Sequence, residues 1–285
     1  MTEPVKPGER PPGMVRIPGC SFVYRLTNSA PESQYPYASP PFQPTYAYLP
    51  GSPPSIRQMN LKAFWIDRYP VTNREYGAFV AASGYHPQND SNSLRYFAGG
   101  RVPNGLEDHP VVYVSYSDAK AYAEWAGKRL PTEEEWQFAA GAADGRDWPW
   151  GGAEDTSRYN ASRTGTEPVN AHPSGASPHG VEDLVGNVWQ WTASLIDNGR
   201  HLTVMLRGGS WYVPPKGRGW RWTALQPWVS DASKTSDHAL NAVRTAMVRD
   251  LRIHPPCRWS LPPNFAMAAR GVVARDANAK PLHTA

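Results

Sequence analysis

Proline and glycine interrupt this chain so often that long helices and long strands are excluded. Its 285 residues include 30 Pro and 24 Gly, which end regular elements and favour turns. The chain also carries 12 Trp, whose large apolar rings can hold irregular loops together. We therefore expect an α+β domain in which short helices, short strands and long loops surround an aromatic core.

The chain is expected to form one domain, because a protein of this length buries most of its apolar surface without disulfides. Residues 1–13 are polar and proline-rich and are expected to be disordered. Residues 14–285 are expected to form the domain, with a Pro- and Tyr-rich insertion at 27–58. Residues 224–285 are expected to be a divergent C-terminal segment.

Charge and cysteine content exclude several classes of partner. The net charge of +4 is spread along the chain without a basic run, so no nucleic acid is expected. Cys20 and Cys257 make no disulfide framework, and whether they pair stays open. No apolar run is long enough for a membrane span, and residues 1–12 lack the apolar core of a secretory signal. The sequence thus predicts a cytoplasmic protein; its oligomeric state stays open.

Local patterns predict a series of short elements. Thr72 is expected to start a helix that Gly84 ends, Ser117 to cap a second, and Thr132 with Glu135 to form the capping box of a third. Trp125 and Trp136 are expected in the core. Strands are expected at residues 14–19, 61–66, 111–114, 188–191 and 204–211. One further piece, helical or extended, is expected at 239–249.

Four longer signatures occur in order along the chain. They are residues 65–76 (WIDRYPVTNREY), 109–119 (HPVVYVSYSDA), 129–137 (RLPTEEEWQ), and 186–192 (GNVWQWT) followed by 206–211 (LRGGSW). Together they resemble the formylglycine-generating enzyme, or sulfatase-modifying factor, family, which includes the pyoverdine-maturation oxidase and part of the ergothioneine sulfoxide synthases. The resemblance covers residues 14–223 and implies the fold of this family, a C-type-lectin-like variant with little regular secondary structure.

The resemblance implies structural calcium in the loop that precedes residue 191. Asp183 matches a side-chain ligand of the family, Gly186 and Val188 match carbonyl ligands, and Gln190 stands where a Glu is common. Calcium prefers six to eight oxygen ligands, so the loss of a carboxylate should weaken the site. A second site is suggested by Asn160 and Ala161. The alternative is a turn closed by side-chain hydrogen bonds.

The main departure from the family follows the Gly-Gly-Ser turn. The copper oxidases of this family carry cysteines at positions that are Val213 and Arg218 here. Copper(I) requires thiolates, so no copper is expected. No closely spaced histidine pair occurs, so iron is not expected either. The residues proposed to contact a substrate, through stacking and Arg contacts, are Trp189, Ser210, Arg218, Trp220 and Arg221.

Three functions remain open. The first is an oxidase-like tailoring enzyme that acts on a peptide-derived or aromatic metabolite, and no catalytic residue can be named for it. The second is a non-catalytic binding module for a small molecule or a peptide on a calcium-braced scaffold. The third is a subunit that contacts a true enzyme through residues 27–58. A cluster of convergent polar groups would favour the first.

Overall fold

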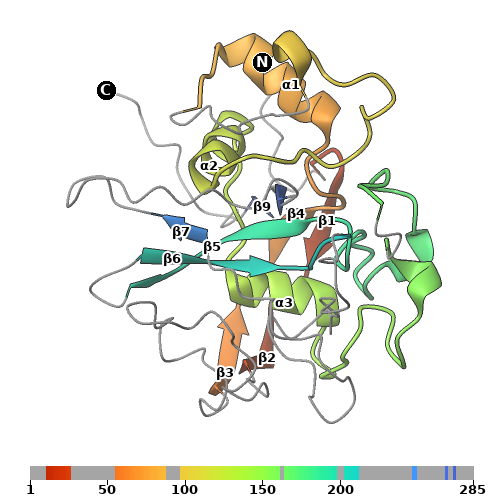
Figure 1. Ribbon diagram of the computed structural model, residues 1–285. Helices are drawn as coiled ribbons and strands as arrows, with labels where there is room; N and C mark the ends of the chain where they lie inside the picture. The colour runs from red at the N-terminus through yellow and green to blue at the C-terminus, as the bar shows by residue number, and fades with distance from the viewer. Residues whose placement is uncertain are drawn as a thin grey trace, which may run out of the picture.

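The computed structural model describes residues 11–26, 55–87, 97–160, 164–197, 202–211, 246–248, 267–268 and 272–273 (Figure 1). Predictions for residues 1–10 and 27–54, and for most of the chain after residue 211, lie outside this part. The elements in chain order are β1 (Met14–Ile17), β2 (Cys20–Leu26), β3 (Ser55–Leu61), β4 (Phe64–Asp67), α1 (Asn73–Ser83), η3 (Ala98–Gly100), α2 (Tyr116–Trp125), α3 (Glu133–Gly141), η4 (Thr156–Arg158), η5 (Pro173–Gly175), β5 (Trp189–Asp197), β6 (Leu202–Arg207), β7 (Ala246–Val248), β8 (Met267–Ala268) and β9 (Val272–Val273).

The strands form three small sheets. Strands β1, β4 and β9 pair antiparallel in that order, and β2 pairs antiparallel with β3. The third sheet has the order β7-β6-β5-β8, in which β8 runs parallel to β5 and the other pairs are antiparallel. Short strands and a mixed sheet agree with the α+β class.

Helix α3 is the centre of the core. It lies beneath β5 and β6 and above the β2–β3 hairpin (Figure 1). Trp136 of α3 is fully buried, as predicted, and Phe138 packs against Phe22 of β2 with ring centroids 5.1 Å apart. Because both faces of this helix are covered, almost every residue in it is buried.

The three α-helices in the described part of the chain each begin with a capping box, in which the N-cap hydroxyl and the carboxylate three residues later bind each other's backbone N–H. The boxes at Thr72 and Thr132 confirm the predicted helix starts. The prediction for α2 is wrong by two residues. Its N-cap is Ser115, because Asp118 stands three residues after Ser115 and completes the box.

Two further predictions need correction. Trp125 is 47% exposed, because it is the last residue of α2 and comes after the buried residues of that helix. Its ring packs against Phe79 of α1 and Tyr122 of α2. Val111, Val112 and Val114 are buried, but the segment 111–114 forms no strand. Tyr113 has a left-handed φ of 59°, which breaks the extended backbone that a strand needs.

The other predicted strands are present, but their ends differ from the prediction. The strand expected at 14–19 ends at Ile17, and the one expected at 61–66 is split between β3 and β4. The one expected at 188–191 is longer than predicted, since β5 runs from 189 to 197. The last, expected at 204–211, ends at Arg207, where two left-handed glycines begin a turn.

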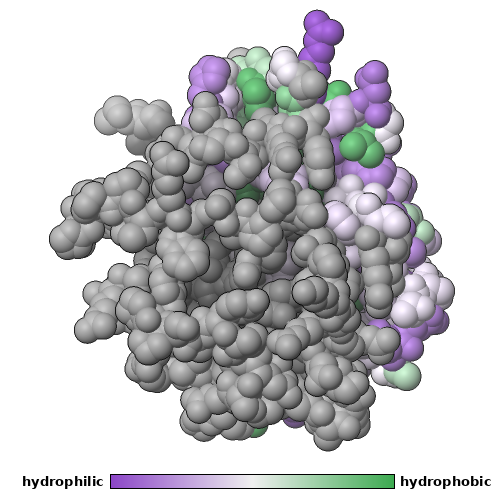
Figure 2. All heavy atoms as spheres, in the orientation of Figure 1, coloured by the Kyte–Doolittle hydropathy of each residue, from purple (hydrophilic) through white to green (hydrophobic). Residues whose placement is uncertain are grey.

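The described surface carries hydrophobic residues singly. On the face shown in Figure 2, green residues lie scattered among purple and white ones. The large exposed apolar side chains come from separate elements, namely Val23, Ile56, Trp125 and Leu195. In the described ranges, no helix is both long enough and apolar enough to cross a lipid bilayer.

Candidate functional site

The two signatures of the second half of the chain lie side by side. In the β5–β6 ladder Gln190 is opposite Arg207, so the loop before β5 meets the turn after β6. The Gly186 N–H donates to the Gly208 carbonyl at 2.8 Å, and the Trp211 N–H donates to the Asn187 carbonyl at 3.0 Å. The turn that carries Ser210 is thereby fixed at both ends to one loop.

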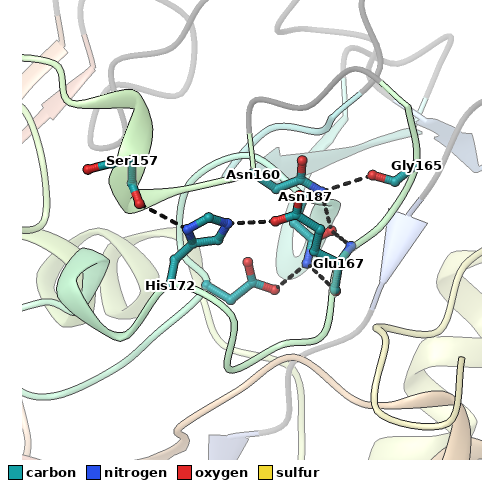
Figure 3. Close-up of polar contacts among 7 residues, drawn as sticks. Ser157, Asn160, Gly165, Glu167, His172 and Asn187 are labelled. Carbon is teal, nitrogen blue, oxygen red and sulfur yellow. Dashed lines mark hydrogen bonds and ion pairs between the residues drawn. The ribbon is translucent and has the colours of Figure 1, made fainter. Parts of the chain in front are cut away.

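Asn187 is the centre of this loop. It is 1% exposed and has a left-handed φ of 54°, a conformation that Asn tolerates better than most residues. Its Oδ1 accepts from Asn160 Nδ2 at 3.1 Å and from the Glu167 N–H at 3.0 Å. Its Nδ2 donates to the Glu167 carbonyl at 3.0 Å and to Asp183 Oδ2 at 2.9 Å (Figure 3). One side chain therefore ties three chain segments together.

A histidine extends this network toward η4. His172 Nε2 lies 2.6 Å from Glu167 Oε2, and Nδ1 lies 3.0 Å from the Ser157 carbonyl (Figure 3). Asn160 Nδ2 also donates to the Gly165 carbonyl at 2.9 Å. Contacts between residues of the segment 157–172 therefore hold its two ends together, and Asn160 and Glu167 of this segment also bind Asn187.

Gln190 links the same loop to the core helix. Its Oε1 accepts from Trp136 Nε1 at 2.9 Å, and its Nε2 donates to the Asp183 carbonyl at 2.7 Å. Arg207, opposite Gln190, is fully buried, pairs with Glu133 at the start of α3, and lies over the Trp136 ring at 5.6 Å. These contacts fasten α3, β5 and β6 to the loop.

The predicted substrate residues are only partly described. Trp189 is 2% exposed, so it belongs to the core that supports the site. Ser210 is half-buried at the end of the glycine turn, and the half-buried Trp211 packs against Val112 and Val188. Arg218, Trp220 and Arg221, like the predicted metal ligand Ala161, lie outside the described residues.

The side chains predicted to bind calcium contact other protein groups. The side-chain oxygen of Gln190 is bound by Trp136, and its NH₂ group points at the Asp183 carbonyl. The Asp183 carboxylate binds Asn187, and the Asn160 side chain binds Asn187 and Gly165. A calcium ion requires oxygens that face it, so this donor arrangement does not fit the first predicted site.

Titratable side chains elsewhere gather no metal site. In the ranges that the structure describes, His, Cys, Asp and Glu form no group of three or more that could hold a metal ion. Burial lowers the pKa of His109, which lies 3.0 Å from the Thr166 hydroxyl. Burial also lowers the pKa of His179, whose ring packs against Phe138. Both rings are built into the scaffold.

A separate open cavity of about 580 Å³ lies beside η4. Trp150 lines it and stacks on Trp148, and the Arg158 guanidinium lies 5.9 Å from the Trp150 ring centroid. Its acidic residues bind their neighbours, since Glu154 accepts from Tyr159 and Asp155 binds Arg158. These contacts hold the polar residues against the aromatic stack that lines the cavity.

Sequence reasoning missed Asn187, Glu167 and His172. The Gly186-Asn187 dipeptide is a known turn signal, and it could have marked Asn187 as a left-handed residue. Its partners outside the loop, Glu167 and Asn160, lie 20 and 27 residues away, and no local pattern identifies them.

Comparison with known proteins places the sequence among its relatives. The family model described as "Sulfatase-modifying factor enzyme 1-like domain" matches residues 2–235. The inactive C-alpha-formylglycine-generating enzyme 2 of Bos taurus is 35% identical over 205 residues, which are 55% of this chain and 68% of that protein. The formylglycine-generating enzyme of Thermomonospora curvata is 32% identical, over 69% of this chain and 76% of that protein.

A hercynine oxygenase of Mycobacterium tuberculosis is 35% identical over 55% of this chain, but the match spans only 47% of that longer protein. Among solved structures, PvdO from Pseudomonas aeruginosa is 25% identical, with a TM-score of 0.47 over 71% of this chain and 83% of that chain. The family model covers well over half of the sequence and includes the loop and turn described above. This chain is therefore a divergent member of the sulfatase-modifying factor, or formylglycine-generating enzyme, family, and it has the α+β fold of that family.

Proposed function

We propose that this chain is an oxidase-like tailoring enzyme that acts on a peptide-derived or aromatic metabolite without a copper thiolate site. The observation that supports this most is the fixed turn at Ser210. Hydrogen bonds from Gly186 and to Asn187 hold that turn from both sides, which is how an enzyme keeps a substrate-contacting group in one position.

The proposed substrate groove follows this turn along the chain. Ser210 contributes a hydroxyl, and Trp211 beside it contributes an aromatic ring. Arg218, Trp220 and Arg221 supply stacking and charged contacts to an aromatic or anionic substrate. Dioxygen is the oxidant, and it accepts a pair of electrons and a pair of protons from the substrate to give hydrogen peroxide. Relatives named as oxygenases and formylglycine-generating enzymes support oxidative chemistry of this kind.

A second candidate is a non-catalytic binding module. It is favoured by the similarity to inactive C-alpha-formylglycine-generating enzyme 2 and by Val213 and Arg218 at the family's cysteine positions. In this alternative the same turn holds a ligand, and no electrons are transferred.

The two functions separate in one experiment. The purified full chain is incubated with a panel of aromatic metabolites and tyrosine-containing peptides, while dioxygen uptake and product mass are followed. Oxygen uptake with loss of a hydrogen pair from one compound supports the enzyme. In that case Ser210→Ala should lower kcat/KM by about tenfold or more, because it removes a contact to the reacting substrate. Ser174→Ala, an exposed serine outside this loop, is the matched control and should not change it.

Binding without oxygen uptake, measured by calorimetry on the same panel, would instead support the binding module. Equal activity of the Ser210 variant and the wild type would contradict the proposal that the turn contacts the substrate.

A further inference from the structure

We propose that side-chain amides brace the loop from Asp183 to Gln190 in place of a calcium ion, so that this domain folds without the metal. The proposal concerns the scaffold and does not depend on the proposed function. It follows from the contacts of Gln190 and Asn187.

The orientation of the Gln190 amide is decided by its neighbour. An indole N–H can only donate, so the group that faces Trp136 Nε1 at 2.9 Å must be the amide oxygen. The NH₂ group is then turned toward the Asp183 carbonyl, which accepts at 2.7 Å. A flipped amide would place two donors against each other at Trp136 and two acceptors against each other at Asp183. The hydrogen-bond pattern therefore permits one orientation only.

This orientation opposes a cation at the loop. A glutamate at position 190 would carry two acceptor oxygens, one for the indole and one free for an ion. Gln190 has one oxygen, which faces the indole N–H, so its amide offers an ion no second oxygen. Its second terminal atom carries hydrogens with partial positive charge, which repel a cation and occupy a backbone carbonyl that could otherwise bind one.

Asn187 provides the rest of the brace. Its Nδ2 donates to the Asp183 carboxylate and to the Glu167 carbonyl, and its Oδ1 accepts from the Glu167 N–H. A calcium ion in a loop of this kind gathers oxygens from several segments, and these two amides perform the same joining task with directed N–H donors. The turn that carries Ser210 is bound to backbone groups of Gly186 and Asn187 in this loop, so the braced loop fixes the turn without the metal.

The first test is thermal unfolding of the full-length wild type, with excess chelator and with millimolar calcium. We expect midpoints within about 1 °C of each other, because a metal that does not bind the native state cannot stabilise it. Calcium titration by calorimetry should give no stoichiometric binding. A wild-type midpoint that falls by about 5 °C or more on chelation, or stoichiometric calcium in the titration, would overturn the proposal.

The second test restores the carboxylate. Gln190→Glu should unfold at a lower temperature than wild type in chelator and regain about 5 °C or more when calcium is added. Gln58→Glu makes the same charge change at an exposed position and should show no response to calcium. A Gln190 variant that folds but ignores calcium would refute the role given to this residue. If that variant does not fold, the wild-type measurements still decide the proposal.

Discussion

Replacing Asn187 with alanine should be among the most damaging single substitutions in the described part of the protein. The change removes four side-chain hydrogen bonds, to Asn160, Asp183 and both backbone groups of Glu167. A buried hydrogen bond contributes about 1 kcal/mol net. Alanine also tolerates the left-handed φ of 54° less well than asparagine does, which costs about 1 kcal/mol more. The expected loss of unfolding free energy is therefore about 5 kcal/mol.

The assay is equilibrium unfolding in urea, followed by tryptophan fluorescence at neutral pH. Asn170→Ala is the matched control, because Asn170 is exposed and lies on the segment that Asn187 holds. The control should stay within about 0.5 kcal/mol of the wild type. A loss below about 1 kcal/mol for Asn187→Ala would refute the reasoning, because it would mean that water replaces the lost partners.

Three further substitutions test the scaffold in the same unfolding assay. In the native state, burial lowers the pKa of His179 from its ordinary value of 6.5, so the protein should lose stability as pH falls below 6.5; His179→Phe should weaken that loss. The same variant removes a buried Nε2 that has no hydrogen-bond partner among the described residues, and it should gain about 1 kcal/mol at neutral pH. Thr132→Ala deletes the acceptor of the Glu135 N–H and should cost about 1 kcal/mol, whereas a serine there should retain most of it. Gly175→Ala would place a Cβ 2.0 Å from the Arg158 carbonyl oxygen and should cost about 3 kcal/mol; an unchanged midpoint would mean that the backbone yields freely.

Local signals made the helices predictable. A hydroxyl followed three residues later by a carboxylate fixes the start of each helix through short-range bonds, as at Thr72 and Thr132. The error at α2 has a physical cause, since Ser115 and Ser117 both offer a hydroxyl. Only the position of Asp118 decides between them.

The candidate site was less predictable, because its bonds join distant segments. Gln190 and Trp136 are 54 residues apart, and Arg207 and Glu133 are 74 apart. Neither pair leaves a periodic pattern in the sequence. Trp189 was predicted to line a groove, but its side chain is buried. A large aromatic ring at the start of a central strand gains more free energy from burial than from exposure.

The bonds that hold the loop and the turn together are formed by backbone groups and by side chains other than cysteine. Arg207 and Gln190 both bind side chains of α3, and Asn187 joins the loop to the turn at Ser210. These bonds join residues between 133 and 211, whereas the family's copper oxidases carry thiols at positions that are Val213 and Arg218 here. Function in such a domain is set by the residues placed on the frame, and the frame itself constrains them little.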